Sequence, residues 1–253
     1  MTIGFGLDLA GFTKRRGTVL ATVSVINGTA EATILTDAPF GRKLNGDFSE
    51  RLICEVKTLR SLLKIGKVAV DVPIDLRGLR VSDVREAWEL TLRPIDKKLG
   101  ALPPLASWLG ACVARFKAIL SPDIQEELGK QLFETYPAAS LRMLFGKNDP
   151  DVKQYKLAAK RKAEIACAAR KSLVVRLKID AKSTALTHDE LDAVICAITA
   201  VASDKYVWDE RSSELSKATP LPDGYRLLRS NPFTKIVVGM EKYDYWMRQT
   251  VSR

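Results

Sequence analysis

The first part of the chain alternates between short apolar runs and polar turns, as an antiparallel meander does. Residues 3–9 form an apolar run that carries Asp8 near its end, and residues 18–26 alternate and are rich in β-branched side chains. An Asn-Gly pair follows, which is a strong hairpin signal, and residues 29–35 supply the returning strand. The pattern predicts three antiparallel strands, with Asp8 on the first.

Helical spacing then takes over. Apolar residues at intervals of three and four predict a helix over 48–64. A short predicted strand at 68–70 is followed directly by Asp71. Several prolines break residues 78–128 into pieces, which we interpret as a helical insertion. The segment that carries Glu134 predicts a fifth strand.

The last third begins with two basic helical segments between residues 153 and 180. Thr187 and Glu190 then form a capping box, which predicts a helix to about Ser203. A strand-like piece at 235–239 lies in the remaining tail. This order of elements predicts an α/β layered domain with a mixed five-stranded sheet. We expect one domain over residues 1–253, with a C-terminal extension at about 205–253.

Composition excludes several classes of protein. The longest apolar stretch is about half of the roughly 20 residues that a membrane helix needs, and the N-terminus lacks the order of a secretory signal. We therefore expect a cytoplasmic protein that does not bind membranes. The four cysteines form no CxxC pair, and we expect reduced thiols in the core. One histidine, His188, cannot build an ordinary His/Cys zinc site, so any metal must be held by carboxylates.

Charge is concentrated in one region. The chain has 40 basic and 30 acidic side chains, a net charge of +10, and a surplus of eight lies between Lys153 and Lys182. Such a stretch favours backbone contacts with nucleic acid, DNA or RNA, although a solvated helical face is the alternative. The residues that we expect to bind nucleic acid are Lys14, Arg15, Arg16, Lys156, Lys160, Arg161 and Lys162.

Five acids stand at the ends of predicted elements, where ligands collect in α/β sheets. They are Asp8, Asp71, Glu134, Asp189 and Asp192. Like charges held this close repel one another unless a cation neutralises them, and Mg²⁺, with Mn²⁺ as a substitute, prefers oxygen ligands. Two such ions about 3.5–4 Å apart would promote phosphodiester hydrolysis. For each acid the alternative is a structural role, such as capping a turn or complementing a helix dipole. His188 would orient a water or a phosphate, or would simply begin a helix.

Four motifs resemble a known family. They are GFGLDLAG, VAVDVPI, FETYPAA and HDELDAVICAITA. Together they resemble domain-of-unknown-function family 429, a family of predicted nucleases with a ribonuclease H-like fold, and the layout is similar to Holliday-junction resolvases. The resemblance implies a three-layer fold with helices on both faces of the sheet. It also implies that Asp8, Asp71, Glu134 and the Asp189/Asp192 pair match the family's acids.

The leading hypothesis is a Mg²⁺-dependent nuclease. All five acids are its candidate catalytic residues, and Asp8, Asp71, Asp189 and Asp192 are its candidate metal ligands. A non-catalytic nucleic-acid-binding protein of the same fold is the main alternative. A nucleotide phosphotransferase of the actin and sugar-kinase type is a third, because GFGLDLAGFTKRRG resembles the phosphate-binding opening of those folds. The oligomeric state stays open, a homodimer included.

Overall fold

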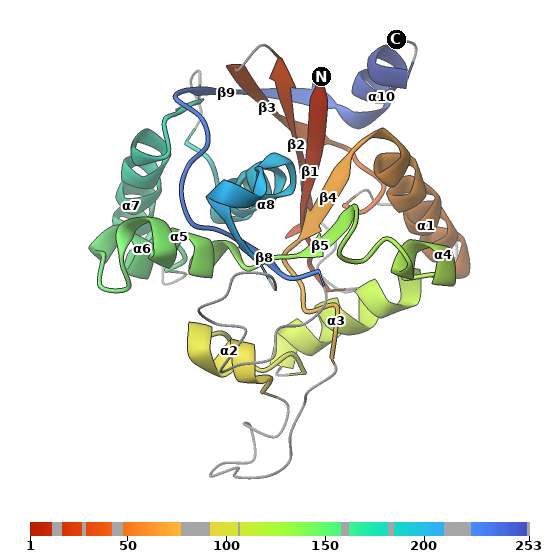
Figure 1. Ribbon diagram of the computed structural model, residues 1–253, viewed down its shortest axis with the longest axis horizontal. Coiled ribbons are helices and arrows are strands. Elements are labelled where there is room, and N and C mark those ends of the chain that lie inside the picture. The colour runs from red at the N-terminus through yellow and green to blue at the C-terminus, as the bar shows by residue number, and fades with distance from the viewer. Residues whose placement is uncertain are drawn as a thin grey trace.

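A mixed sheet of seven strands forms the centre of the computed structural model, in the order β5-β4-β1-β2-β3-β9-β6 (Figure 1). The structure describes residues 1–11, 17–26, 29–41, 48–76, 92–105, 107–157, 162–181, 185–209 and 224–251. The central strands are β1 (Thr2–Asp8), β2 (Val19–Ile26), β3 (Thr29–Thr36), β4 (Lys67–Val70), β5 (Leu132–Glu134), β6 (Ile179–Ala181) and β9 (Ile236–Lys242). A separate two-stranded sheet pairs β7 (Val207–Asp209) with β8 (Arg226–Leu228).

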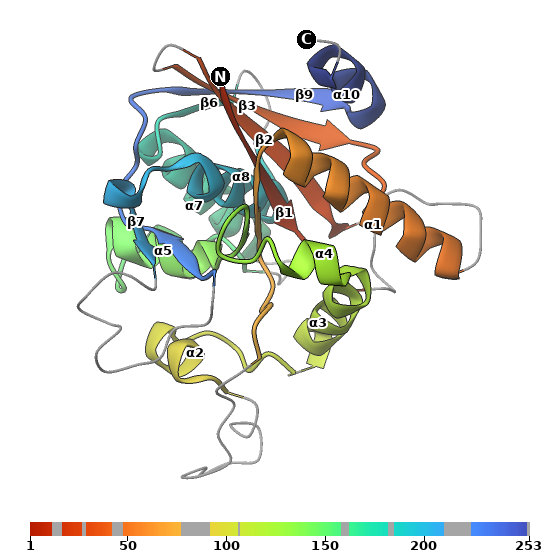
Figure 2. The ribbon, with the colours of Figure 1, turned by 45° about the vertical axis from the view of Figure 1, so that its right-hand side comes forward.

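Helices cover both faces of this sheet. They are α1 (Phe48–Ile65), α2 (Pro94–Leu99), α3 (Ser107–Ile119), α4 (Pro122–Gln125), α5 (Pro137–Phe145), α6 (Pro150–Gln154), α7 (Ala163–Arg176), α8 (His188–Val201), the 3-10 helix η4 (Asp204–Tyr206) and α10 (Tyr243–Val251). Helices α1 and α10 lie on one face, and α7 and α8 on the other (Figure 2). No helix in the described ranges is long and apolar enough to cross a membrane.

The predicted meander is confirmed, but the predicted number of strands is wrong. Strands β1, β2 and β3 are antiparallel neighbours, and β4 and β5 extend the sheet in parallel beside β1. Two further strands lie beyond β3, where β9 pairs with β3 and β6 pairs with β9, both in parallel. Strand β6 has only three residues at the end of a stretch with helical spacing, so the pattern predicted helix there.

Strand β1 separates two hydrophobic cores. Ile3, Phe5 and Leu7 belong to the core beneath α1, α3 and α10. Because side chains alternate along a strand, Gly4, Gly6 and Asp8 occupy the opposite face, against which α8 packs. A Cβ atom on Gly6 would overlap the backbone of α8 at Ala193 and Ala197. The glycines therefore allow α8 to lie directly on β1, in line with Asp8.

Helix α8 begins as predicted. The Thr187 hydroxyl accepts a hydrogen bond of 3.2 Å from the Glu190 amide, and the Glu190 carboxylate accepts one of 2.7 Å from the Thr187 amide. This capping box is confirmed, and it fixes where the first turn of α8 starts. The acids of that turn consequently have a defined place over the sheet.

The predicted insertion is helical where the structure describes it, in α2, α3 and α4, and residues 77–91 lie outside the described ranges. Phe116 and Ile119 of α3 are fully buried in the same core as α1. Helices α2 and α3 lie beyond the end at which β1 finishes (Figure 1). The insertion therefore stands next to the carboxyl edge of the sheet.

Candidate functional site

Two acids leave the sheet at the same level. Strands β1 and β4 are parallel, and Leu7 pairs with Val70 in their ladder. The Asp71 amide continues that ladder with a hydrogen bond of 2.9 Å to the Leu7 carbonyl. Asp8 and Asp71 therefore occupy the next row, at the carboxyl edge where ligands collect in such sheets.

Helix α8 adds two more acids to this edge. Asp189 and Asp192 are three residues apart in its first turns, so they share one face of the helix. Asp192 is fully buried. Asp8 and Asp189 lie close enough for each to affect the pKa of the other. The structure thus brings four of the five predicted acids together.

The negative charge of these four acids is only partly balanced by nearby positive charge. Loss of hydration, followed by repulsion from Asp71 and Asp192, raises the pKa of Asp8 well above its usual range. Loss of hydration likewise raises the pKa of Asp71 to about 7, and it raises that of Asp192, although Lys156 lowers both. The pKa of Asp189 is lowered, because its contact with His188 outweighs its burial. Burial and repulsion therefore disfavour the ionised form of Asp8 more than that of Asp189.

Lys156 lies inside this cluster. Its ammonium Nζ is 2.5 Å from Asp192 Oδ2, and it also stands over the Tyr155 ring at 5.5 Å from the centroid. The Tyr155 hydroxyl donates a hydrogen bond of 3.1 Å to Asp192 Oδ1. Both residues directly follow α6 in the chain. From the sequence we predicted Lys156 as a nucleic-acid contact and predicted no role for Tyr155. The one sequence feature that distinguishes Tyr155 is that it is the only aromatic residue of the basic stretch.

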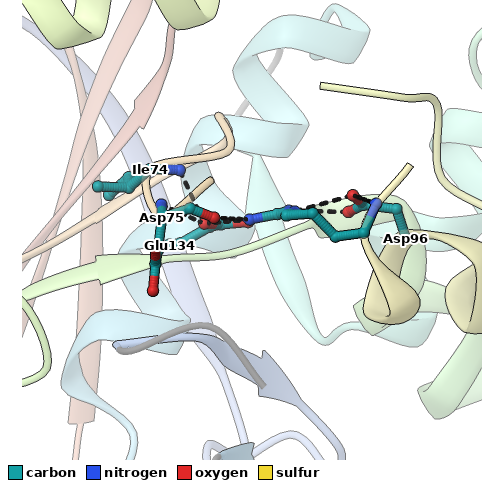
Figure 3. A network of polar contacts seen from close by, with 5 residues as sticks. Ile74, Asp75, Asp96 and Glu134 are labelled. Carbon is teal, nitrogen blue, oxygen red and sulfur yellow. Dashed lines mark hydrogen bonds and ion pairs between the residues drawn. The ribbon is translucent and has the colours of Figure 1, made fainter. Parts of the chain in front are cut away.

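Glu134 is bound elsewhere, in a network that the sequence did not reveal (Figure 3). Its carboxylate accepts hydrogen bonds of 2.6 and 3.0 Å from the Arg93 guanidinium and one of 2.7 Å from the Ile74 amide. Arg93 also pairs with Asp96 at 2.7 Å, and all three charged side chains are buried. Burial raises the pKa of Glu134, although Arg93 lowers it. Glu134 is therefore held by Arg93, while its charge still contributes to the raised pKa of Asp71.

The alternation of side chains along β5 explains this separation. Leu132 belongs to the core on the α1 face, whereas Phe133 packs with Cys196 of α8. Glu134 falls on the same face as Leu132, away from α8. The other acids stand on the α8 face, so Glu134 reaches the same edge from the opposite side of the sheet.

Thr135 returns to the α8 face, one residue later. Its amide donates a hydrogen bond of 3.0 Å to the Val70 carbonyl, which places it in the row of Asp71. Its hydroxyl is buried and has no hydrogen-bond partner among the described residues. Buried hydroxyls are normally satisfied, so this oxygen is suited to meet a water or a cation at the carboxyl edge.

The donors of this edge fit a magnesium ion by their chemistry, since they are carboxylate and hydroxyl oxygens and the acids are short of positive charge. As the side chains stand, no three Asp, Glu, His or Cys groups within the described ranges gather closely enough to hold a metal ion. The Lys156 ammonium group stands against Asp192 instead. Asp8, Asp71, Asp189 and Asp192 are the residues that could hold a cation if their side chains moved closer together.

A buried arginine braces the chain directly after Asp8. Arg115 of α3 pairs with Glu55 of α1 at 2.9 Å, and neither side chain is exposed. Its guanidinium also donates to the Ala10 carbonyl at 2.5 Å and to the Thr18 hydroxyl at 3.0 Å. Arg115 therefore joins both ends of the segment that follows Asp8, and it was not predicted from the sequence.

The remaining predicted site residues have different surroundings. His188 Nε2 lies 2.9 Å from Asp189 Oδ1, and 46% of the His188 side chain is exposed. Lys162 is exposed at the start of α7. The other predicted nucleic-acid contacts, Lys14, Arg15, Arg16, Lys160 and Arg161, lie outside the described ranges.

No curated protein matches the chain. A family model does match it. A family model described as "Protein of unknown function (DUF429)" matches residues 8–212, which is most of the chain and contains all the acids of the site. The motifs VAVDVPI, FETYPAA and HDELDAVICAITA lie within that range, which begins at Asp8 in the middle of GFGLDLAG. The chain belongs to the DUF429 family.

Proposed function

We propose that this protein is a metal-dependent nuclease with a ribonuclease H-like fold, which hydrolyses phosphodiester bonds of nucleic acid. The observation that carries the proposal is the convergence of Asp8, Asp71, Asp189 and Asp192 at one edge of the sheet. The like charges of such a cluster repel one another, which destabilises the folded protein. Clusters of this kind occur chiefly at sites where the acids bind cations or take part in catalysis.

The fold supports the same reading. Strands β5, β4, β1, β2 and β3 form a mixed five-stranded unit inside the larger sheet, and its first three strands in sequence are antiparallel. Helices cover both faces, and a helical insertion precedes β5. This is the layout that the motif resemblance implies.

In the proposed site, Asp8, Asp71, Asp189 and Asp192 would hold Mg²⁺, or Mn²⁺ as its substitute. Bound magnesium would stabilise charge on the phosphate and acidify water. A bound cation would favour the ionised form of Asp8, whose pKa is raised by burial and by the neighbouring acids. His188, partly exposed beside Asp189, would meet the scissile phosphate or a water at the open side of the cluster.

Positive charge around the acids would hold the polymer. The basic stretch from Lys153 to Lys182 carries a surplus of eight charges, and Lys162 in it is exposed. Contacts of this kind bind the phosphate backbone without reading bases. The proposed substrate is therefore nucleic acid of either kind, held by its backbone.

The test is cleavage of labelled single-stranded, duplex and branched DNA and RNA, with Mg²⁺ or with a chelator. Asp8→Asn keeps the size of the side chain and removes its negative charge. Asp180→Asn on β6 is the matched control, because Asp180 is 45% exposed in a surface ion pair with Lys235. We expect Mg²⁺-dependent cleavage by the wild type and by Asp180→Asn, and a loss of at least about 100-fold in Asp8→Asn. Equal cleavage by all three proteins would contradict the proposal.

One observation favours a second candidate, a nucleic-acid-binding protein that does not cleave. The raised pKa of Asp8 and the Lys156–Asp192 pair both reduce the negative charge of the cluster without any metal. That protein would bind nucleic acid equally with and without Mg²⁺, and Asp8→Asn would bind as the wild type does. Absence of cleavage together with this binding pattern would favour the second candidate.

A further inference from the structure

One cation stands inside the acid cluster. Lys156 Nζ is 2.5 Å from Asp192 Oδ2, and Asp192 itself is fully buried. Burial lowers the pKa of Lys156, but Asp192, Tyr155, Asp71 and Asp8 together raise it well above its usual value. The ammonium group therefore interacts with acids from β1, from the end of β4 and from α8, and not with one partner alone.

The neighbours of Asp192 leave its second oxygen to this lysine. The Tyr155 hydroxyl bonds to Asp192 Oδ1 at 3.1 Å, while Oδ2 is buried and contacts the ammonium group without accepting a regular hydrogen bond from any described residue. One oxygen of this carboxylate is hydrogen-bonded, and the other contacts only the ammonium group of a lysine. The second oxygen is therefore suited to bind a metal cation. Oδ2 is the atom that a divalent cation would take from Lys156.

We propose that Lys156 is the resident cation of the acid cluster: its ammonium group occupies the place of a divalent cation at Asp192, so the Lys156–Asp192 pair and a bound cation exclude each other. This inference rests on the proposed function, because it assumes that the cluster receives a divalent cation. The sequence analysis assigned Lys156 to nucleic-acid binding. The present proposal assigns it a role in controlling cation binding instead.

The geometry allows such an exchange. The Lys156 side chain is 39% exposed, whereas that of Asp192 is 1% exposed, so the lysine has room to move outward and the acid does not. Tyr155 is buried and stays bonded to Asp192, which keeps the carboxylate in place when the ammonium group leaves. A cation that binds must therefore overcome both the lost ion pair and repulsion from the charge of Lys156.

The test measures Mn²⁺ affinity without nucleic acid, by calorimetry and by the loss of the free Mn²⁺ signal in electron paramagnetic resonance. Lys156→Met removes the charge and keeps most of the stem. Lys57→Met is the control, since Lys57 is an exposed lysine of α1, outside the basic stretch. We expect Lys156→Met to bind Mn²⁺ at least about tenfold more tightly than the wild type, because the positive charge next to Asp192 has been removed. Lys57→Met should bind Mn²⁺ as the wild type does.

A second measurement keeps the test decisive if the variant is unstable. Lys156→Arg retains the charge, so its Mn²⁺ affinity should not exceed that of the wild type, while Mn²⁺ should raise the melting temperature of Lys156→Met more than that of the wild type. Unchanged Mn²⁺ affinity in Lys156→Met, or no Mn²⁺ binding by either protein, would overturn the proposal. The outcomes are separable from those of the nuclease assay. Tighter Mn²⁺ binding without cleavage rejects the nuclease alone, and Mg²⁺-dependent cleavage with unchanged Mn²⁺ affinity rejects the resident cation alone.

Discussion

The backbone amide of Asp71 donates a hydrogen bond of 2.9 Å to the carbonyl of Leu7, the residue directly before Asp8. This bond continues the parallel ladder in which Leu7 pairs with Val70. The two acids therefore leave neighbouring strands at one level, and backbone pairing sets their separation. Both acids are thereby fixed at a buried edge of the sheet, and their burial has measurable consequences for stability as well as for activity.

Replacing Asp71 should stabilise the protein at high pH. Loss of hydration raises the pKa of Asp71 from 3.8 to about 7, so the folded protein holds a proton that the unfolded chain has already released. That contribution to stability is complete in acid and is lost as the pH rises through about 7. The Asp71→Asn side chain does not ionise, so the variant does not lose stability in this way as the pH rises. We expect it to be more stable than the wild type by about 1–2 kcal/mol at about pH 8.

The measurement is urea unfolding of both proteins in the presence of a chelator. The difference between them should shrink towards zero at about pH 4.5, where Asp71 is protonated in the folded wild type. A variant that is destabilised by the same amount at both pH values would show that burial of the ionised Asp71 carboxylate does not lower the stability of the protein.

The approach of α8 to β1 should depend on Gly6. A methyl group there would overlap the α8 backbone at Ala193 and Ala197, which cannot yield as a flexible side chain can. We expect Gly6→Ala to lower the free energy of unfolding by about 2–4 kcal/mol. Gly239→Ala is the matched control, because a Cβ on that strand glycine meets nothing within 4 Å. Urea unfolding of both variants tests this, and equal effects would contradict the packing argument.

Arg93 should be needed for stability, since it holds Glu134 and Asp96. Arg93→Met leaves two buried carboxylates without their partner, and we expect a cost of about 3–5 kcal/mol in the free energy of unfolding. The matched control is Arg60→Met, because Arg60 forms a similar two-pronged pair with Asp123 on the surface, where both side chains are about half exposed. That variant should lose less than about 1 kcal/mol. Comparable losses in both would show that burial of the Arg93 network does not matter.

Nucleic-acid binding should weaken steeply with salt. Each phosphate contact contributes roughly 0.9 to the slope of log affinity against log salt on duplex DNA. Replacing Lys160, Arg161 and Lys162 by alanine should therefore reduce the slope by up to about 3, and Lys57→Ala, an exposed position of α1 on the other face of the sheet, should leave it unchanged. Fluorescence anisotropy titrations at several salt concentrations measure this. An unchanged slope in the triple variant would place the binding surface elsewhere.

Local signals were sufficient for the meander, the capping box and the grouping of four acids. Alternation along 18–35 and the Thr187–Glu190 pair are encoded within a few residues, so they could be recognised without the fold. Strand β9 was recognisable as a strand, but its place beside β3 depends on residues about 200 positions apart. Nothing within either segment specifies that pairing.

The errors at the site have similar causes. Strand β5 is buried on both faces, so its three residues show no alternation that would tell on which side Glu134 lies. Lys156 was grouped with its basic neighbours because charge density is a local property, whereas Asp192, its partner, is a distant residue on α8. Arg93 precedes Pro94 in a loop and has no sequence signal that links it to Glu134.

The most direct test of the central claim is a crystal structure of the protein soaked in Mn²⁺, with anomalous diffraction measured near the manganese edge. We predict an anomalous peak at the carboxyl edge of the sheet, coordinated by Asp8 and Asp71 and by at least one acid of α8, with Lys156 displaced from Asp192. The absence of a peak there, with Lys156 still paired with Asp192, would contradict a metal-dependent site.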